Sequence, residues 1–363
     1  MRGNAGVIGG AAVPHAPQFF TLPDTEDKDQ VARVEETMRA VGEELRDLRP
    51  DAVVIVANDH LKNFLLHCVP GFAVHRGPRA AGTFAGRDFS WTVDSEFATA
   101  LVRSLQDQGF DPAVSMNAPI GYEFGIPLTF MAFPPDTPLV PIFINSYVPP
   151  QPSPDRCFAL GQALARGAEA LGRRIVVVAS GGLSHYPGTE RYGSPDLRTD
   201  EALLERMRAG NLRALLGMDD AELDATGNVE ARSWIVLAGA LGERVPQLVQ
   251  FDPSWHHNYA IVSWTAPDAA RDGVALHYPV PRSDQLPLYE ALYALLTDEE
   301  AGREYVQTPG SFVDRYALRP DEHEALLELD EAGLRALGMH PLLGFLARLE
   351  VDLLRRSETH RRR

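Results

Sequence analysis

Short apolar runs that end in polar clusters organise the first two thirds of the chain. Residues 5–13 and 53–57 are runs of small and β-branched residues, which predicts strands buried on both faces. Between them, apolar residues recur at alternating spacings of three and four: Val31, Val34, Met38, Val41, Leu45 and Leu48. This spacing predicts a helix with one apolar face, which Pro50 ends. Strand, helix and strand in this order form the unit of a sheet with helical crossovers.

The same alternation continues to residue 265. We expect further strands over 113–116, 139–144, 174–180, 246–251 and 259–265. We expect further helices over 95–109, 155–171, 199–209 and 228–241. Residues 62–93 are Gly-rich and predict short strands or loop, and residues 119–127, punctuated by Gly and Pro, predict a loop. The pattern predicts an α/β fold, a three-layer αβα sandwich with a mixed sheet.

The last quarter of the chain has a different pattern. Short helical periods without a strand signal cover residues 287–296, 298–306, 320–328, 330–337 and 341–354. They follow a segment rich in proline and charge, which reads as a linker. We therefore predict a catalytic domain over 1–270, a linker over 271–285, a small all-helical domain over 286–356 and a basic tail over 357–363.

Composition and charge exclude several classes of protein. A formal net charge of −16 over 363 residues argues against a nucleic-acid partner, because binding phosphates needs a basic face. No apolar run approaches the roughly 18 residues of a membrane span, so no membrane partner is expected. The first residues lack the apolar segment of a signal peptide, and two cysteines do not indicate a disulfide framework. We expect a cytoplasmic protein.

Polar side chains that can bind metal follow several of the predicted elements. His15, His60 and His185 each come after a strand, and Asn228 is a plausible N-cap that places Glu230 in the first turn of a helix. Two imidazoles and one carboxylate form the facial triad of non-haem Fe(II) enzymes, and a further histidine can act as acid or base. Because the chain has 11 histidines, surface or core roles for these residues remain open.

Other catalytic patterns are absent from the sequence. There is no His-Glu-x-x-His zinc motif, no Cys-x-x-Cys pair and no phosphate-binding Gly-x-x-x-x-Gly-Lys-Ser/Thr loop. The stretch Gly182-Leu183-Ser184-His185-Tyr186 differs from a nucleophile elbow, because Tyr186 stands where the second glycine is required.

Four motifs in order carry a resemblance to a known family: Pro14-His15-Ala16-Pro17, Asn58-Asp59-His60, Gly181-Gly182-Leu183-Ser184-His185 and Gly227-Asn228-Val229-Glu230. They resemble the class III extradiol dioxygenases, the family of protocatechuate 4,5-dioxygenase catalytic subunits and gallate dioxygenases. The resemblance covers about residues 5–265, and the helical end of the chain looks like the family's small subunit, fused here at the C-terminus. In such enzymes the helical part covers the mouth of the active site, and the catalytic domains commonly form dimers.

The resemblance implies a role for each of these residues. His15, His60 and Glu230 become ligands of Fe(II), with O2 as co-substrate, and His185 becomes the acid/base residue. Asp59 becomes a structural neighbour rather than a ligand, because the family takes its carboxylate from the glutamate.

One position departs from the family pattern. Tyr122 stands where the family often has a histidine close to the substrate, if the loop before Ile126-Pro127-Leu128 aligns without a gap. A phenol can donate a hydrogen bond but is neutral at pH 7, so Tyr122 is a candidate catalytic residue with an altered role. Further candidates for contact with the substrate or its carboxylate are Asn58, Ser184, Arg232, His256, His257 and Asn258.

We therefore expect an Fe(II)-dependent extradiol dioxygenase that opens a protocatechuate- or gallate-like catechol and forms a homodimer. The same chemistry on a 2-aminophenol, a zinc-dependent hydrolase with the same triad, and a non-catalytic binding relative are the alternatives.

Overall fold

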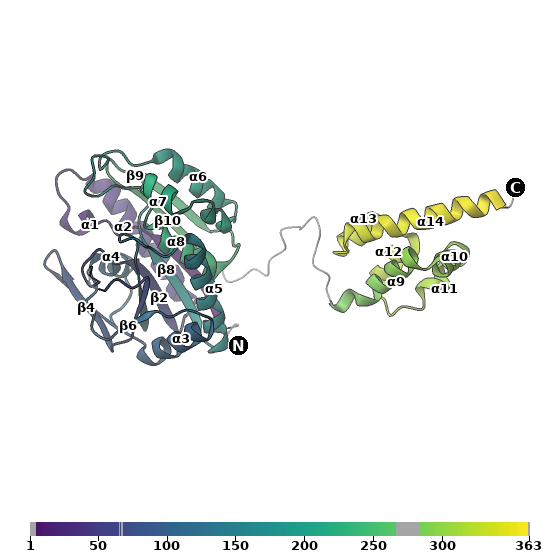
Figure 1. Cartoon of the computed structure of the whole chain (residues 1–363), viewed down its shortest axis with the longest axis horizontal. Coiled ribbons are helices and arrows are strands. Elements are labelled where there is room, and N and C mark those ends of the chain that lie inside the picture. Colours follow the sequence, from purple (N-terminus) through teal and green to yellow (C-terminus); the bar gives the residue numbers. More distant parts are fainter. Residues whose placement is uncertain (1–4, 65, 67, 266–282, 362–363) are drawn as a thin grey trace. The chain divides into compact units, whose positions relative to one another are not determined.

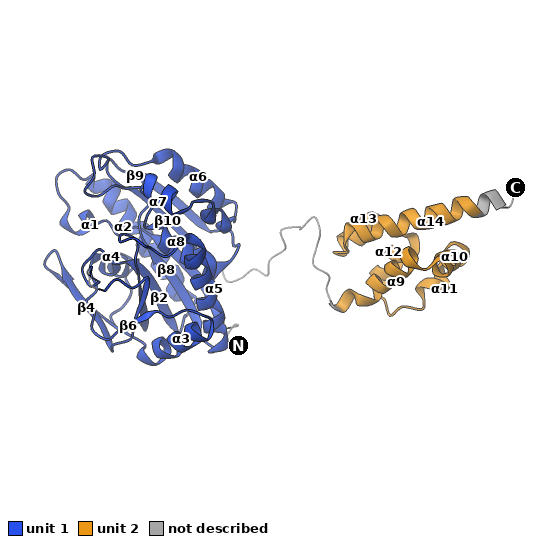
Figure 2. Cartoon of the chain, viewed as in Figure 1, with its two compact units in different colours: residues 1–268 blue, residues 269–363 orange. Residues whose placement is uncertain are grey.

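The computed structural model describes residues 5–64, 66, 68–265 and 283–361. The chain divides into two compact units, Met1–Asp268 and Ala269–Arg363, which Figure 2 distinguishes by colour. The predicted linker over 271–285 lies mostly outside the described residues.

A mixed sheet forms the centre of the first unit (Figure 1). In spatial order its strands are β6 (Ala113–Ser115), β3 (Phe72–His75), β7 (Leu139–Ile144), β2 (Ala52–Asn58), β8 (Arg174–Ser180), β1 (Gly6–Val13), β10 (Asn258–Trp264) and β9 (Leu248–Pro253). The central strands β7, β2, β8 and β1 are parallel. Strand β10 runs antiparallel to β1 at one side and β3 runs antiparallel to β7 at the other, which confirms the mixed sheet.

Alternate side chains of the central strands face two separate cores. In β2, Val54 and Val56 belong to one cluster, whereas Val53, Ile55 and Ala57 belong to the other. Successive strand residues point to opposite faces of a sheet, so a run that is apolar throughout needs a cover on each face. The three-layer αβα arrangement predicted from the sequence is confirmed.

Helices supply both covers. One face carries α3 (Ser95–Asp107), α5 (Pro154–Ala170), α6 (Leu197–Arg208), η1 (Leu212–Gly217), α7 (Asp220–Ala225) and α8 (Ala231–Leu241). The other carries α1 (Gln18–Thr21), α2 (Lys28–Asp47), α4 (Tyr122–Phe130) and the hairpin β4 (Arg79–Phe84) and β5 (Arg87–Thr92). The short elements α1, η1 and α7 were not predicted.

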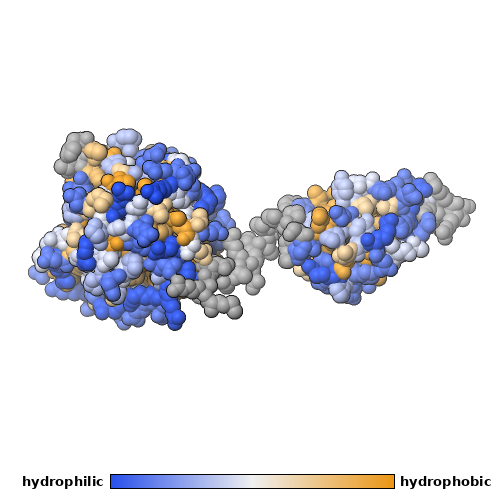
Figure 3. Space-filling view, turned by 90° about the horizontal axis from the view of Figure 1, so that it is seen from below, coloured by the Kyte–Doolittle hydropathy of each residue, from blue (hydrophilic) through white to orange (hydrophobic). Residues whose placement is uncertain are grey.

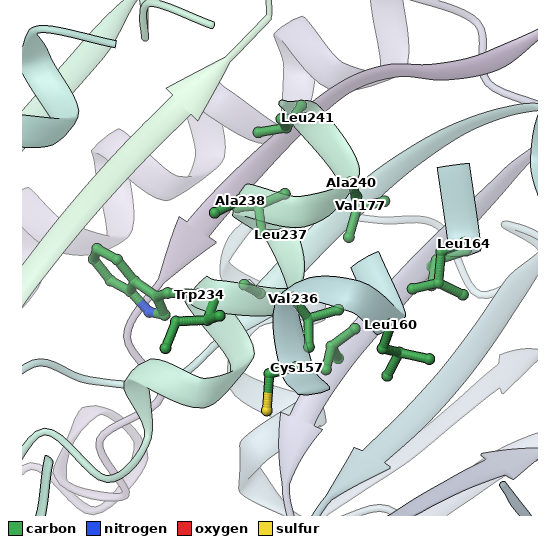
Figure 4. Close-up of a cluster of buried hydrophobic side chains, with 14 of the residues drawn as sticks. Cys157, Leu160, Leu164, Val177, Trp234, Val236, Leu237, Ala238, Ala240 and Leu241 are labelled. Atoms are coloured by element: carbon green, nitrogen blue, oxygen red, sulfur yellow. The ribbon is translucent and has the colours of Figure 1, made fainter. Parts of the chain in front are cut away.

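Helices α5 and α8 approach each other through glycine (Figure 4). A Cβ atom at Gly161 of α5 would lie 1.9 Å from the carbonyl oxygen of Val236, and one at Gly239 of α8 would lie 2.0 Å from that of Phe158. Figure 4 labels Leu160 of α5 and Val236 of α8 at this contact. Because the backbones touch, no side chain fits at either glycine without moving one helix.

The loop predicted for residues 119–127 ends at Gly121, and the prediction is wrong for residues 122–127. The chain forms helix α4 from Tyr122 to Phe130, with Pro127 inside it. Most of its residues are buried around the whole circumference, so it shows no polar face and no helical stripe in the sequence. Gly121 and Pro127 therefore suggested a loop where a buried helix forms.

The second unit is helical in its described part, as predicted. It contains α9 (Leu286–Thr297), α10 (Glu299–Gln307), α11 (Pro309–Val313), α12 (Pro320–Glu328), α13 (Glu331–Ala336) and α14 (Pro341–Arg361), and a short turn, η2 (Ser283–Gln285), precedes them. Leu292, Tyr305 and Phe312 are fully buried in a core of its own. Helix α14 continues to Arg361, so most of the segment predicted as a tail is helical.

On the face shown in Figure 3, hydrophilic residues predominate and hydrophobic ones gather in scattered patches. Among the described residues, no helix has both the length and the apolar character needed to cross a membrane.

The α5–α8 contact predicts the effect of adding one methyl group. Gly161→Ala should lower the free energy of unfolding of the first unit by about 1–3 kcal/mol or more, because the methyl group overlaps the Val236 carbonyl. All four tryptophans of the chain lie in the first unit, so fluorescence during urea unfolding measures this unit alone. Gly217→Ala is the matched control, because a Cβ there meets only the end of the Arg206 side chain at 3.9 Å. Equal effects of the two variants would contradict the close contact.

Buried His75 predicts a dependence of stability on pH. Burial lowers the pKa of His75, while its Nε2 lies 3.0 Å from the carbonyl oxygen of Arg79. Below about pH 6.5 the unfolded chain binds a proton that the folded chain refuses, so stability falls as the pH drops. His75→Gln should lose less stability than the parent on acidification, by up to about 1.4 kcal/mol per pH unit. Parallel stability curves of the two proteins between pH 7 and 5, followed by tryptophan fluorescence, would contradict this.

Candidate metal and substrate site

Three predicted metal ligands converge at the carboxyl edge of the sheet. His15 follows the end of β1 by two residues and His60 follows the end of β2 by two, and both strands run parallel to β8 between them. Glu230 immediately precedes α8. The two Nε2 atoms lie 3.4 Å apart, and Oε1 of Glu230 lies 3.3 Å from that of His15 and 2.9 Å from that of His60. Each of these three side chains offers one ligand atom, and the three atoms lie within 4.8 Å of one another, so the group could hold a metal ion.

A chain of hydrogen bonds fixes the ring of His15. Its Nδ1 lies 2.8 Å from Oγ of Ser180, whose hydroxyl donates to the carbonyl oxygen of Glu123 at 2.5 Å. That carbonyl is four residues before Pro127, which has no N–H to offer it within α4. Since the Ser180 proton goes to the carbonyl, Oγ accepts from Nδ1–H of His15. The lone pair of neutral His15 is therefore on Nε2, facing Glu230 and His60.

Glu230 is held as a carboxylate by groups on both of its oxygens. Oε2 accepts from the backbone N–H of Gly182 at 2.8 Å, and Oε1 accepts from the hydroxyl of Tyr147 at 2.7 Å. Burial raises the pKa of Glu230, but the nearby imidazoles of His15, His185 and His60 outweigh burial and hold this pKa well below its ordinary value. The site therefore presents one fixed negative charge.

His60 faces a second buried carboxylate. Its Nδ1 lies 4.0 Å from Oε2 of Glu123, and both atoms are buried without a hydrogen-bond partner among the described residues. Burial lowers the pKa of His60, but Glu230, Glu123 and Asp59 together raise it above the ordinary value. Asp59 itself accepts from the backbone of Asn63 and Phe64, which fits the structural role predicted for it.

The predicted acid/base residue, His185, is stacked on a second histidine. The rings of His185 and His257 are 4.1 Å apart and nearly parallel, at 6°. Nδ1 of His185 donates to the carbonyl oxygen of Leu183 at 2.8 Å, so in the neutral ring Nε2 is free to accept a proton. Burial lowers the pKa of both imidazoles. A Cβ at Gly182 would lie 1.6 Å from Nε2 of His257, so only glycine leaves room for this stack.

Sequence reasoning missed Tyr147, which lies between the candidate metal ligand Glu230 and His185. Its hydroxyl lies 2.7 Å from Oε1 of Glu230 and 3.3 Å from Nε2 of His185. Burial raises the pKa of Tyr147, and the charge of Glu230 raises it further, so the phenol stays protonated. The sequence did contain a signal, because Asn145-Ser146-Tyr147 follows the buried strand β7 as Asp59-His60 follows β2.

A cavity of about 220 Å³ opens onto these groups. Its lining includes the predicted residues His15, His60, Tyr122, His185, Glu230, His256 and His257. The Tyr122 ring lies 4.9 Å from the ring of His60, next to the proposed ligands. Nε2 of His256 lies 3.1 Å from Oε1 of the buried Glu26, a partner that the sequence pattern did not indicate.

Four predicted substrate contacts are instead parts of the framework. Asn58, Ser184, Asn258 and Arg232 do not line the cavity, and their side chains bond to protein groups. Asn58 donates to the carbonyl of Ser180, and Arg232 is buried with its guanidinium on Asp220 at 2.6 Å. Each is a polar group that burial obliges to find protein partners.

One buried carboxylate holds three segments of the site together. Asp200 of α6 is fully buried and accepts from Oγ of Ser184 at 2.5 Å, Nδ2 of Asn228 at 3.0 Å and Nδ2 of Asn258 at 2.7 Å. Ser184 precedes His185, Asn228 stands two residues before Glu230, and Asn258 follows His257. The side chain of Asn228 bonds to Asp200 rather than capping α8, so the predicted N-cap is wrong and α8 begins at Ala231.

Asp200→Asn tests this arrangement. The amide nitrogen would face N–H or O–H donors, and each buried donor left without an acceptor costs about 1–3 kcal/mol. We expect the first unit to lose stability by about that amount and the folded variant to bind divalent metal more weakly. Urea unfolding by tryptophan fluorescence and metal titration are the measurements. Asp107→Asn, at an exposed position in α3, is the control. A variant with unchanged stability and metal affinity would contradict the role of Asp200.

Comparison with known proteins places this site in a family. Residues 9–264 match the family model described as the catalytic LigB subunit of aromatic ring-opening dioxygenase. A Klebsiella pneumoniae protein named 2,3-dihydroxyphenylpropionate/2,3-dihydroxicinnamic acid 1,2-dioxygenase is 32% identical over 192 residues, or 52% of this chain and 60% of that protein. A Pseudomonas putida protein named as form 1 of the same enzyme is 29% identical over 232 residues, 63% of this chain and 69% of that protein.

The chain spans between half and two thirds of the length of three such relatives, the Klebsiella pneumoniae protein among them. The crystal structure of an uncharacterized Escherichia coli K12 protein covers 70% of this chain and 99% of its own, at 18% identity and a TM-score of 0.46. The helical unit lies outside the residues that the family model matches, so its likeness to a small subunit stays a prediction.

The family model covers most of the first unit, including all five predicted catalytic and metal-binding residues: His15, His60, Tyr122, His185 and Glu230. The chain therefore belongs to the family of catalytic LigB subunits of aromatic ring-opening dioxygenases.

Proposed function

We propose that this protein is a non-haem Fe(II) dioxygenase that opens the ring of a catechol by extradiol cleavage and incorporates both atoms of O2. The observation that carries the proposal is the convergence of His15, His60 and Glu230 within 3.4 Å of one another, in a chain that belongs to a ring-opening dioxygenase family. Of the other functions considered, a zinc hydrolase uses the same ligand types, and the experiment below separates it.

The three side chains fit a metal ion. Ligands about 2.1 Å from a common ion at right angles to one another lie about 3 Å apart, close to the separations found here. The lone pair of His15 already faces the site because Ser180 holds its other nitrogen, and Glu230 is ionised. Bound Fe(II) would supply open coordination positions and electron transfer between an aromatic diol and dioxygen.

His185 and Tyr147 supply the proton chemistry of the proposal. Neutral His185, with Nδ1 fixed on the Leu183 carbonyl, accepts a proton from the diol at Nε2 and can return it during ring opening. The hydroxyl of Tyr147 lies between Nε2 of His185 and Oε1 of Glu230, so it holds the carboxylate in place beside the acid/base residue. Tyr122, which also lines the cavity, offers a further neutral donor.

The substrate we propose is a single-ring catechol with a short acidic side chain. A cavity of about 220 Å³ suits one ring, and stacked imidazoles provide a flat wall. The names of the relatives specify dihydroxyphenyl acids, and protocatechuate and gallate, expected from the sequence, also carry a carboxylate. A 2-aminophenol could bind through the same atoms and belongs in the substrate screen.

Metal removal and restoration tests the function. Metal-free protein should regain O2 uptake with a catechol after anaerobic addition of Fe(II), but not of Zn(II), with one O2 consumed per ring opened. Label from 18O2 should enter the product twice. Hydrolysis supported by Zn(II) without O2 would establish the hydrolase instead. Stoichiometric metal binding with no turnover of any catechol or aminophenol would leave a non-catalytic relative.

His185→Gln tests the acid/base role within that assay. The variant should bind Fe(II) as the parent does, because His185 is not one of the three proposed ligands, and should lose turnover by roughly 10²–10⁴-fold. His323→Gln, at a partly exposed position in the helical unit, is the matched control. A rate equal to that of the parent would remove His185 from the mechanism.

A further inference from the structure

The cavity contains no permanent cation of its own. Among the described residues that line it, none is a lysine or an arginine, and the fixed charge is the carboxylate of Glu230. The chain as a whole carries a net charge of −16. An acidic ligand would therefore meet an unfavourable potential unless a local cation offsets it.

One lysine stands beside the cavity. The ammonium group of Lys62 lies 4.6 Å from the centre of the Tyr122 ring and 5.2 Å from that of Phe84. Tyr122 lines the cavity, and so does Leu61, which connects Lys62 to the proposed ligand His60. Leu61 has a positive φ of 58°, which turns the chain immediately after His60. Lys62 is thus held by two aromatic faces at the edge of the substrate pocket.

Lys62 has no ion-pair partner among the described residues. No carboxylate oxygen of a described residue lies within 4.0 Å of its Nζ, the distance limit for an ion pair. The buried acid Glu123 accepts with Oε1 from the N–H of Gly121 at 2.7 Å, and its Oε2 has no hydrogen-bond partner among the described residues. A Cβ at Gly121 would lie 2.9 Å from Nζ, so the missing side chain there makes the space that Lys62 occupies.

The choice of a lysine at this position stands out from the rest of the chain. Of the 34 basic residues only two are lysines, Lys28 and Lys62, and the others are arginines. Lys28 lies at the exposed start of α2, 3.7 Å from a carboxylate oxygen of Asp24. Lys28 therefore provides a matched control for Lys62.

We propose that Lys62 is a specificity-determining residue, whose ammonium group binds the carboxylate on the side chain of an acidic catechol. The inference rests on the proposed function, which places the diol of the substrate at His15, His60 and Glu230. The Tyr122 ring lies 4.9 Å from the ring of His60 and 4.6 Å from the ammonium group of Lys62, so a ring substituent directed along Tyr122 reaches that ammonium group. The ion pair forms at the edge of an apolar wall, where a charge-assisted hydrogen bond is stronger than in open water.

The test compares two substrates that differ in one charge. The first is 2,3-dihydroxyphenylpropionate, and the second is the analogue with a propyl group in place of the propionate. Lys62→Gln in the iron-loaded full chain should lower kcat/KM for the acid by about 10–100-fold, mostly through KM, since one charge-assisted contact is lost. For the uncharged analogue kcat/KM should change less than about twofold. Lys62→Arg should restore most of the acid's kcat/KM, because it keeps the charge and the aromatic seat.

Two further measurements separate recognition from a structural effect. Lys28→Gln should leave both substrates unchanged. Calorimetric titration with phenylpropionate, which has no diol, should show weaker binding to Lys62→Gln than to the parent, without any turnover.

The outcomes distinguish the two proposals. If the parent turns over no catechol or aminophenol, the proposed function fails. If it turns over other catechols but neither of these two, the function stands and the pairing of Lys62 with this side chain is wrong. If the parent turns over both, and Lys62→Gln affects them equally or not at all, the function stands and the role of Lys62 is wrong.

Discussion

The buried carboxylate of Asp200 is the interaction on which the geometry of the site depends. A charge in the interior is tolerated only when hydrogen-bond donors surround it, and Asp200 draws these donors from three separate segments. The same bonds that satisfy the charge also bring His185, Glu230 and His257 to one edge of the sheet. Satisfying one buried anion and assembling the site are therefore the same physical event.

The donor atoms around the proposed metal are oriented mostly by the backbone. Oε2 of Glu230 accepts from the N–H of Gly182, Nδ1 of His185 donates to the Leu183 carbonyl, and His15 is held through Ser180 by the Glu123 carbonyl. Backbone groups at strand ends move little, so the tautomers of His15 and His185 are set before any ligand arrives. Such preorganisation lowers the cost of ordering the site on binding.

The sequence predicted the parts of this site that obey a local rule. His15, His60 and His185 each follow a buried strand, and parallel strands end at a common edge, so their convergence could be inferred. Helix α4 could not be found by periodicity, because a helix buried on every side has no polar face. The roles of Glu123 and Asp200 could not be assigned from the sequence. Partners distant in sequence decide whether a carboxylate is a metal ligand, a buried hydrogen-bond acceptor or a surface charge. The choice between Asn228 as cap and as a bond to Asp200 was likewise settled by tertiary contacts.

Pro127 affects both the stability of helix α4 and the orientation of His15. A proline inside a short helix weakens it, and the lost hydrogen bond leaves the Glu123 carbonyl free to receive the Ser180 hydroxyl. Any change that repaired the helix would supply a competing donor for that carbonyl and loosen the support of His15. Selection for a more stable α4 and selection for a well-oriented His15 therefore oppose each other at this residue, a local trade-off between stability and activity.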